Sequence, residues 1–398
     1  MARHSGRLLG ARRWLSRLPY RKSIALLILF AVAFGSYYKL SSDDSHGASS
    51  VGSESANAIA AAAQRVTPSA SASSSASPSP KPSRTKKKAA AAAKKQAAGL
   101  PDATSALHWL SGVSYPDLNP YSSQNADATA AFGTWRGRPT TVVVTWPNRN
   151  VWSDFTEPNA MYSEWAAQSY KKVFGLPMFP EGVGADIQSC DNGDYNSEWQ
   201  QFAQTMNSTG LAGEGTIIRL GWEMNITAGW GTPEQFAECW RQIVSTVSAI
   251  APGLLWDWNP NRGSGTQMPG NSILDAYPGD AYVNIIGLDA YDDWPDALTS
   301  AGWQQQLNGA YGLNYWLHFA EQHGKQFSVP EWADVNSDQW PGESGGDDPA
   351  YIKDMYDFFA ANASEIAFES YFCGAGYCID NPDEYPQSAS EYQSLWGS

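Results

Sequence analysis

Histidine is scarce in this chain, and the patterns that bind catalytic metals or nucleotides are missing. Only five histidines occur among the 398 residues, and they form no His-x-His or His-Glu-x-x-His set, which argues against a catalytic transition metal. No glycine-rich phosphate turn follows the first apolar, strand-like run, which argues against dinucleotide binding. We therefore expect chemistry that needs neither a metal nor another cofactor.

Positive charge is also scarce, in the larger C-terminal part of the chain. Residues 1–100 contain 16 of the 26 Lys and Arg but only 3 of the 40 Asp and Glu, which leaves 10 basic against 37 acidic residues in the remainder. The field of that acidic part would repel nucleic acid and anionic membrane surfaces. No nucleic-acid partner is expected, whereas a neutral partner such as a polysaccharide meets no repulsion.

A targeting segment is predicted at the N-terminus. Seven Arg and Lys lie within residues 1–22, directly before the uncharged run 23–38, which is rich in Leu, Ile, Ala and Phe. Basic flanks stay in the cytoplasm, so the remainder is expected to be exported. We predict a cytoplasmic segment at 1–22 and a transmembrane signal-anchor at 23–40, which would hold the chain at the cell membrane. The uncharged run has 16 residues, fewer than the roughly 20 apolar residues that a spanning helix needs. A cleaved signal peptide is therefore the alternative.

A linker is predicted at residues 41–104. This segment consists largely of Ser, Ala, Pro and Lys, with almost no large apolar side chains. Such a composition buries too little surface to offset the entropy of ordering, so we expect a disordered tether. Its basic run, residues 86–95, is either a contact for anionic cell-wall polymer or lipid headgroups, or a solvated spacer.

Four cysteines, Cys190, Cys239, Cys373 and Cys378, all lie in the part expected to be exported, where disulfides are chemically permitted. Three pairings are possible. The short loop favours Cys373 with Cys378, which leaves Cys190 for Cys239. The alternative is that Cys239, on an apolar helix stripe, is a buried free thiol.

A single (β/α)8 TIM barrel is predicted for residues 105–398. Short apolar runs alternate there with longer amphipathic segments, which is typical of a parallel α/β fold. Eight such repeats match the eight strand-helix units of a TIM barrel, whose usual length is about 250 residues. We expect this catalytic domain to be monomeric. The predicted strands are 109–113, 141–145, 173–177, 216–220, 254–258, 283–288, 326–329 and 367–372.

Two helix starts carry clear signals. Thr232, Pro233 and Gln235 form the pattern of a capping box with proline at the first helical position, and an apolar stripe follows it. Asp348 and Pro349 open a second helix in the same way. Helix capping and the binding of hydroxyl groups explain the Asp-rich stretches at 292–293 and 347–348 more economically than calcium binding does.

Two glutamates stand at the ends of the fourth and seventh predicted strands. Glu223 follows the fourth run in TIIRLGWEMN, and Glu331 follows the seventh in QFSVPEWAD. Catalytic groups of TIM barrels project from these strand ends, and strands four and seven face each other across the barrel. Glycoside hydrolysis needs such a carboxylate pair. A negative Glu331 nearby would raise the pKa of Glu223 and keep it protonated for the first step.

The chain resembles the retaining β-mannanases of glycoside hydrolase family 26, from about residue 108 onward. The motifs that carry the resemblance are IIRLGWEMN with the following GWG, WDWNPN, YPGDAYVNIIGLDAY and FSVPEW. It implies that Glu223 is the acid/base, Glu331 the nucleophile, and Tyr291 the hydroxyl that orients the nucleophile. One residue departs from the pattern: well-known mannanases of the family carry His before the acid/base, where this chain has Trp222.

Aromatic and polar side chains near the strand ends are candidates for substrate binding. Indole rings stack on the apolar faces of sugars, and 18 Trp occur in the chain. Arg219 either pairs with a catalytic carboxylate or forms a structural ion pair lower in the barrel. Asn225 and Asn259 either bind sugar hydroxyls or shape turns, and Trp240 is expected in the core. The tryptophan candidates are Trp146, Trp230, Trp258, Trp294 and Trp332, with Trp222 beside Glu223.

Three functions remain open on the sequence alone. The first is a retaining hydrolase that cuts internal bonds of a β-linked polysaccharide, with β-mannan favoured. The second keeps the mechanism and changes the substrate to β-glucan, β-1,3-xylan or an exopolysaccharide, as the departure at Trp222 suggests. The third is a surface protein that binds glycan without cutting it.

Overall fold

A computed structural model of the chain describes residues 107–227, 229–263, 268, 273–381 and 383–397. The predicted anchor and linker lie outside these ranges. Within them, no helix has both the length and the apolar character that crossing a membrane requires.

Eight parallel strands form a closed barrel, which confirms the predicted fold. The last strand, β9, pairs with the first, β1, and β6 pairs directly with β8. The two-residue β7 (Ala290–Tyr291) pairs with the end of β8. All eight predicted runs coincide with strands of the barrel. These are β1 (Leu110–Ser114), β2 (Val142–Thr145), β3 (Lys171–Leu176), β4 (Ile217–Leu220), β5 (Leu255–Trp258), β6 (Ile285–Gly287), β8 (Gln326–Ala333) and β9 (Ile366–Phe372).

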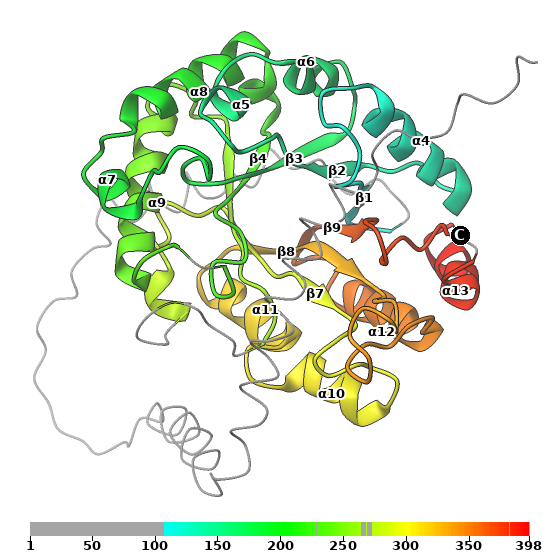
Figure 1. Cartoon of the computed structure of the whole chain (residues 1–398). Coiled ribbons are helices and arrows are strands. Elements are labelled where there is room, and N and C mark those ends of the chain that lie inside the picture. The colour runs from blue at the N-terminus through cyan, green and yellow to red at the C-terminus, as the bar shows by residue number, and fades with distance from the viewer. Residues whose placement is uncertain (1–106, 228, 264–267, 269–272, 382, 398) are drawn as a thin grey trace, which may run out of the picture. The chain divides into compact units, whose positions relative to one another are not determined.

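Helices surround the strands (Figure 1). Between β5 and β6, the described residues contain only the 3-10 turn η4 (Ile273–Ala276); a second such turn, η3 (Leu211–Glu214), precedes β4. The α-helices are α4 (Gln124–Arg136), α5 (Ser153–Thr156), α6 (Ala160–Ala166), α7 (Ile187–Asp191), α8 (Asn196–Ser208), α9 (Pro233–Ser248), α10 (Ser300–Asn308), α11 (Leu313–Gln322), α12 (Pro349–Ala361) and α13 (Pro386–Trp396).

Both predicted helix starts are confirmed. At α9, Thr232 and Gln235 make both hydrogen bonds of the capping box, and Pro233 is the first helical residue. At α12, the side chain of Asp348 accepts a hydrogen bond from the backbone N–H of Ala350. These caps satisfy N–H groups that have no partner inside a helix, so each helix begins where the sequence predicts.

Two apolar cores are separated by the wall of the barrel. Successive side chains of a strand point to opposite faces, so one set fills the barrel and the other packs under the helices. In β5, Leu255 belongs to the interior cluster and Trp256 to the cluster under the helices. The same alternation turns Asp257 inward, where it accepts a hydrogen bond from Ser328 Oγ at 2.8 Å, and turns Trp258 outward.

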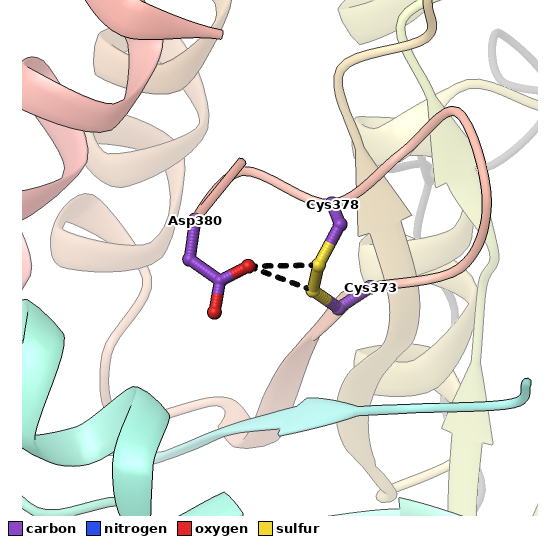
Figure 2. Close-up of side chains that lie close together, drawn as sticks. All are labelled: Cys373, Cys378 and Asp380. Carbon is purple, nitrogen blue, oxygen red and sulfur yellow. Dashed lines mark hydrogen bonds between the residues drawn. A yellow bond between two sulfur atoms is a disulfide. The ribbon is translucent and has the colours of Figure 1, made fainter. Parts of the chain in front are cut away.

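Both favoured disulfides are present. Cys190 of α7 is bonded to Cys239 of α9, and Cys373 is bonded to Cys378 in the loop that follows β9. Figure 2 shows the second bridge beside Asp380, whose Oδ1 lies 2.9 Å from Cys378 Sγ. The alternative that Cys239 is a free thiol is therefore wrong. Tyr377 lies in the loop that the bond between Cys373 and Cys378 closes.

Candidate active site

Glu223 lies in the tight turn that follows β4. Its backbone has φ of 51°, in the left-handed region that residues with a side chain seldom adopt. The backbone N–H of Glu223 donates to Asn259 O at 2.7 Å, and its carboxylate Oε1 accepts from Asn261 Nδ2 at 2.7 Å. The turn is thus bonded to the segment that follows the next strand, β5.

Glu331 lies within β8, where the pairing with β9 is irregular between Val329 and Trp332. Its side chain is 7% exposed. Oε1 accepts from Arg219 Nη1 at 2.5 Å, and Oε2 accepts from Tyr291 Oη at 2.6 Å. Both contacts stabilise a negative carboxylate and fix its orientation, as an attacking carboxylate requires.

Arg219 joins four elements of the barrel. This fully buried residue of β4 donates Nε to Asn259 Oδ1 and Nη2 to Asp289 Oδ2, besides its bond to Glu331. The structure therefore pairs Arg219 with the predicted nucleophile, which was one of its two possible roles. Asp289, two residues after the end of β6, was not predicted; its signal in the sequence was the strand end in the motif LDAY.

Burial and neighbouring charges give the two glutamates different electrostatic environments. The pKa of Glu223 is raised to about 7 by burial and by the charge of Glu331, while the hydrogen bond from Asn261 and the charge of Arg219 lower it. Burial and the charge of Glu331 also raise the pKa of Tyr291, which keeps its hydroxyl a donor. Near neutral pH, the arrangement therefore holds a protonatable Glu223 opposite a carboxylate that is paired with a cation.

Trp222 and Trp146 lie together near the catalytic turn. Their rings are 6.4 Å apart, and the guanidinium carbons of Arg149 and Arg219 lie 5.4 and 5.6 Å from the ring of Trp222. Trp146 packs at the end of the interior core, and its indole N–H has no hydrogen-bond partner among the described residues. A buried donor of this kind is suited to a ligand hydroxyl. Arg149 was missed by the sequence analysis.

Two of the predicted binding tryptophans are wrong. Trp258 and Trp332 are fully buried. Trp258 Nε1 donates to Ala276 O at 3.2 Å, and Trp332 Nε1 donates to Glu369 Oε2 at 2.7 Å. Each follows an inward-facing acidic residue, so alternation turns each ring toward the helices. Trp240 is also buried, as predicted.

The two asparagines near the turn act within the protein. Asn225 is fully buried, and its side chain bonds the backbone N and O of Asn261. Asn259 is fully buried between Arg219 and Pro260 O. The prediction that Asn225 binds substrate is therefore wrong, because both ends of its amide are engaged by backbone; turn formation was the alternative.

Trp230 and Trp294 remain candidates for sugar binding. Both are half-buried. Trp230 packs against Phe179 with ring centroids 5.4 Å apart, and its indole N–H has no partner among the described residues. Trp294 lies 6.3 Å from Trp340, a half-buried residue that the sequence analysis did not select.

One group of side chains has the spacing of metal ligands within the described residues. It consists of Cys373, Cys378 and Asp380. Because both sulfurs are in a disulfide, the group offers no thiolate, the form of cysteine that binds metals. In the Asp-rich stretches, Asp348 caps α12 and Asp347 accepts hydrogen bonds from the backbone of α13, in agreement with the capping interpretation.

A parallel barrel with two carboxylates at the C-terminal ends of its strands places them where glycoside hydrolysis needs its carboxylate pair. The model of glycosyl hydrolase family 26 matches residues 217–350, which contain both glutamates. A mannan endo-1,4-beta-mannosidase of Bifidobacterium adolescentis is 23% identical over 293 residues. That match covers 69% of this chain and 26% of the relative, so the chain spans about a quarter of the relative's length.

Solved structures agree on the fold. The catalytic domain of the family 26 endo-beta-1,4-mannanase of Bacillus sp. JAMB-750 superposes with a TM-score of 0.54 at 15% identity, covering 77% of this chain and 90% of that one. A double mutant of a Cellulomonas fimi endo-beta-1,4-mannanase gives 0.51 at 16% identity, with 75% and 74% covered. These structures share the fold of this chain, and the family 26 model matches the segment that contains Glu223 and Glu331.

Proposed function

We propose that the chain is a retaining endo-β-mannanase. The observation that carries this proposal is the contrast within the carboxylate pair: Glu331 is held by Arg219 and Tyr291, while burial and the charge of Glu331 raise the pKa of Glu223 to about 7. A carboxylate fixed by donors suits nucleophilic attack, and an acid that is protonated near neutral pH suits departure of the leaving sugar.

The reaction would proceed in two displacements. Glu331 attacks the anomeric carbon as the glycosidic bond breaks, and Glu223 transfers its proton to the departing oxygen. A covalent glycosyl-enzyme results, in which Glu331 has lost its charge. Glu223, now a carboxylate, removes a proton from water, whose oxygen attacks the anomeric carbon and releases Glu331. Inversion at each step gives net retention.

Mannan as substrate is proposed from the relatives that carry that activity in their names. Trp222 supports the alternative of another β-glycan cut by the same mechanism. An indole N–H donates a hydrogen bond and cannot accept one, whereas a histidine can do both. Trp222, the residue before the acid/base, can therefore only donate a hydrogen bond to a sugar hydroxyl, whereas the histidine of well-known family members can donate or accept one.

We also propose that the enzyme is a monomer held at the cell surface, with residues 23–40 as a single-pass anchor and 41–104 as a tether. The charge reversal between the basic N-terminal part and the acidic remainder supports this arrangement. Fractionation of cells together with N-terminal sequencing tests it. Recovery of a soluble protein that begins beyond residue 35 would contradict the anchor. Deletion of residues 86–95 then tests whether this basic run binds cell-wall polymer and so retains the chain at the cell surface.

The activity is tested with the full chain on a panel of β-mannan, β-glucans and xylans. New reducing ends are measured, and proton NMR identifies the anomer that forms first. We expect β-mannan to be cut internally with the β-anomer formed first, and Glu223→Ala and Glu331→Ala to remove the activity. Cleavage of another β-glycan alone would replace the substrate but keep the mechanism. An α-anomer formed first would contradict retention, and glycan binding without turnover would contradict hydrolysis.

A further inference from the structure

Three hydrogen bonds join the backbone of the segment after β5 to the turn that carries Glu223. Glu223 N donates to Asn259 O at 2.7 Å. Asn261 N donates to Asn225 Oδ1 at 2.8 Å, and Asn225 Nδ2 donates to Asn261 O at 3.0 Å. These bonds fix the backbone of Asn261 relative to Glu223, so the Asn261 side chain approaches the acid from a defined direction.

That side chain contacts the acid itself. Asn261 Nδ2 donates to Glu223 Oε1 at 2.7 Å. An amide N–H can donate equally to the carbonyl oxygen of a carboxylic acid and to an oxygen of a carboxylate. With Oε1 occupied by a donor, the acidic proton of Glu223 belongs on Oε2, the oxygen left for the substrate.

We propose that Asn261 is a positioning residue for the acid/base, which presents Oε2 of Glu223 to the glycosidic oxygen and stabilises the carboxylate that follows proton transfer. The inference rests on the proposed function and deepens it. It concerns the same two steps: the proton moves from Oε2 to the leaving oxygen, and later returns from water to the same atom. Through both steps the amide of Asn261 remains a donor to Oε1, while the charge of Glu223 appears and disappears.

The neighbouring amides have other tasks. Asn225 serves the backbone of Asn261, and Asn259 serves Arg219. Asn261 is the asparagine of the three whose side chain bonds the acid/base, and it is half-buried at the site, whereas Asn225 and Asn259 are fully buried. A hydrogen bond to the charged form lowers the pKa of a carboxylic acid, and the bond from Asn261 acts in that direction on Glu223.

The test uses the full chain with Asn261→Ala and Asn261→Asp, and Asn308→Ala at an exposed position on α10 as the matched control. We measure kcat/KM against pH on the polysaccharide and on aryl glycosides with leaving groups of graded acidity. For Asn261→Ala, the basic limb should move up by about 1 pH unit, because the donor to the carboxylate is gone. The loss on the polysaccharide should be about 10- to 100-fold and should shrink as the leaving group becomes more acidic.

Asn261→Asp keeps the size of the side chain and replaces the donor by a second carboxylate. It should move the basic limb further than Asn261→Ala does, and it serves as the test if Asn261→Ala fails to fold, as judged by its thermal melt. An unmoved basic limb, or a loss equal for all leaving groups, would overturn the proposal and leave Asn261 a structural role.

A readout without turnover separates this inference from the proposed function. Carbon-13 NMR of the glutamate carboxyls, in a Glu331→Gln background with and without Asn261→Ala, follows the titration of Glu223 directly. We expect a higher pKa for Glu223 when Asn261 is absent, even if no glycan of the panel is cut. An identical titration would refute the role of Asn261 whatever the activity assays show.

Discussion

Glu331 contacts a cation and a hydroxyl donor, whereas Glu223 contacts one neutral amide and forms no ion pair with any described residue. Glu223 lies in the turn after β4 and Glu331 lies near the end of β8, and both are acidic side chains of the same type. The difference comes from the hydrogen-bond donors on neighbouring segments. Arg219 and Tyr291 donate to Glu331, while Glu223, in the turn after β4, accepts from Asn261. Two carboxyl groups of the same kind are thereby placed in different electrostatic environments.

Removal of the better-held carboxylate should have the largest effect. Glu331→Ala should lower kcat on the polysaccharide on the order of 10⁴-fold or more, since no other group can form the covalent intermediate. Steady-state rates check this value. In the variant, azide added with an activated β-glycosyl fluoride should enter from the opposite face and give an α-linked azide. A β-linked azide would contradict the assignment of Glu331.

Glu223→Ala should have a smaller effect that depends on the leaving group. The loss on the polysaccharide should be about 10²- to 10⁴-fold, the range for a general acid. It should nearly vanish in the first step for a dinitrophenyl leaving group, which departs without a proton. Azide should restore turnover by attacking the glycosyl-enzyme, with a β-linked product. Equal losses for all leaving groups would argue against the acid role.

The pH profile should show the acid directly. Because Glu223 must be protonated in the first step and its pKa is raised to about 7, kcat/KM should fall as pH rises through about 7, by up to tenfold per unit. Rates measured with the polysaccharide between pH 4 and 9 test this expectation. The basic limb should disappear in Glu223→Ala. If the limb persisted there, it would belong to another group.

Tyr291→Phe should weaken the hold on Glu331 without removing it. The variant loses a 2.6 Å hydrogen bond to the carboxylate, and Arg219 keeps its own. Bonds to charged groups contribute about 1.5–3 kcal/mol, so kcat should fall about 10- to 100-fold. Tyr315→Phe, on the helix α11, is the matched control. A loss below twofold for Tyr291→Phe would mean that Arg219 alone positions the nucleophile.

Asp334 extends the comparison to a buried carboxylate without a cation. It is fully buried and forms no ion pair with any described residue, and the side chain of Ser388 is its hydrogen-bonding neighbour. Burial and the charge of Asp292 raise the pKa of Asp334 well above its usual range. The folded state thus keeps a proton that the unfolded state has released, so stability present at low pH is lost as pH rises through the folded pKa.

Asp334→Asn imitates the protonated acid and should remove that loss. We expect the melting temperature to rise by about 2–4 °C at pH 8 and to match the wild type near pH 4. Melting curves at both pH values provide the check, with Asp338→Asn in an exposed loop as control. A destabilised variant at pH 8 would show that the negative charge of Asp334 is needed in the fold.

Alternation along the strands explains both the successes and the errors of the sequence analysis. The apolar runs located all eight barrel strands, because a parallel strand buried on both faces reads as an uninterrupted apolar segment. The selection of tryptophans after strands ignored which face each residue occupies. Asp257 and Glu331 point inward, so their neighbours Trp258 and Trp332 point toward the helices, and this rule was available from the sequence.

Other features of the site depend on contacts between distant segments. Asn261 and Asn225 are 36 residues apart, and their mutual bonds require β4 and β5 to be adjacent in the barrel. Asn261 lay in the motif WDWNPN, but nothing in its spacing indicates that its amide reaches Glu223. Arg149 lies in the loop after β2 and contacts the ring of Trp222. No local sequence pattern predicts the path of that loop.

The sequence by itself determined the barrel and the helix starts, because these depend on periodicity and capping residues. It favoured the two disulfide pairs that form, and its assignment of the two carboxylates stays a prediction. Only the tertiary structure showed that Arg219 and Tyr291 hold Glu331 and that Asn261 meets Glu223. Long-range hydrogen bonds and burial depend on how far strands are staggered and where loops pass. Those quantities also set the pKa of Glu223, which is the physical reason why one glutamate suits the role of acid and the other that of nucleophile.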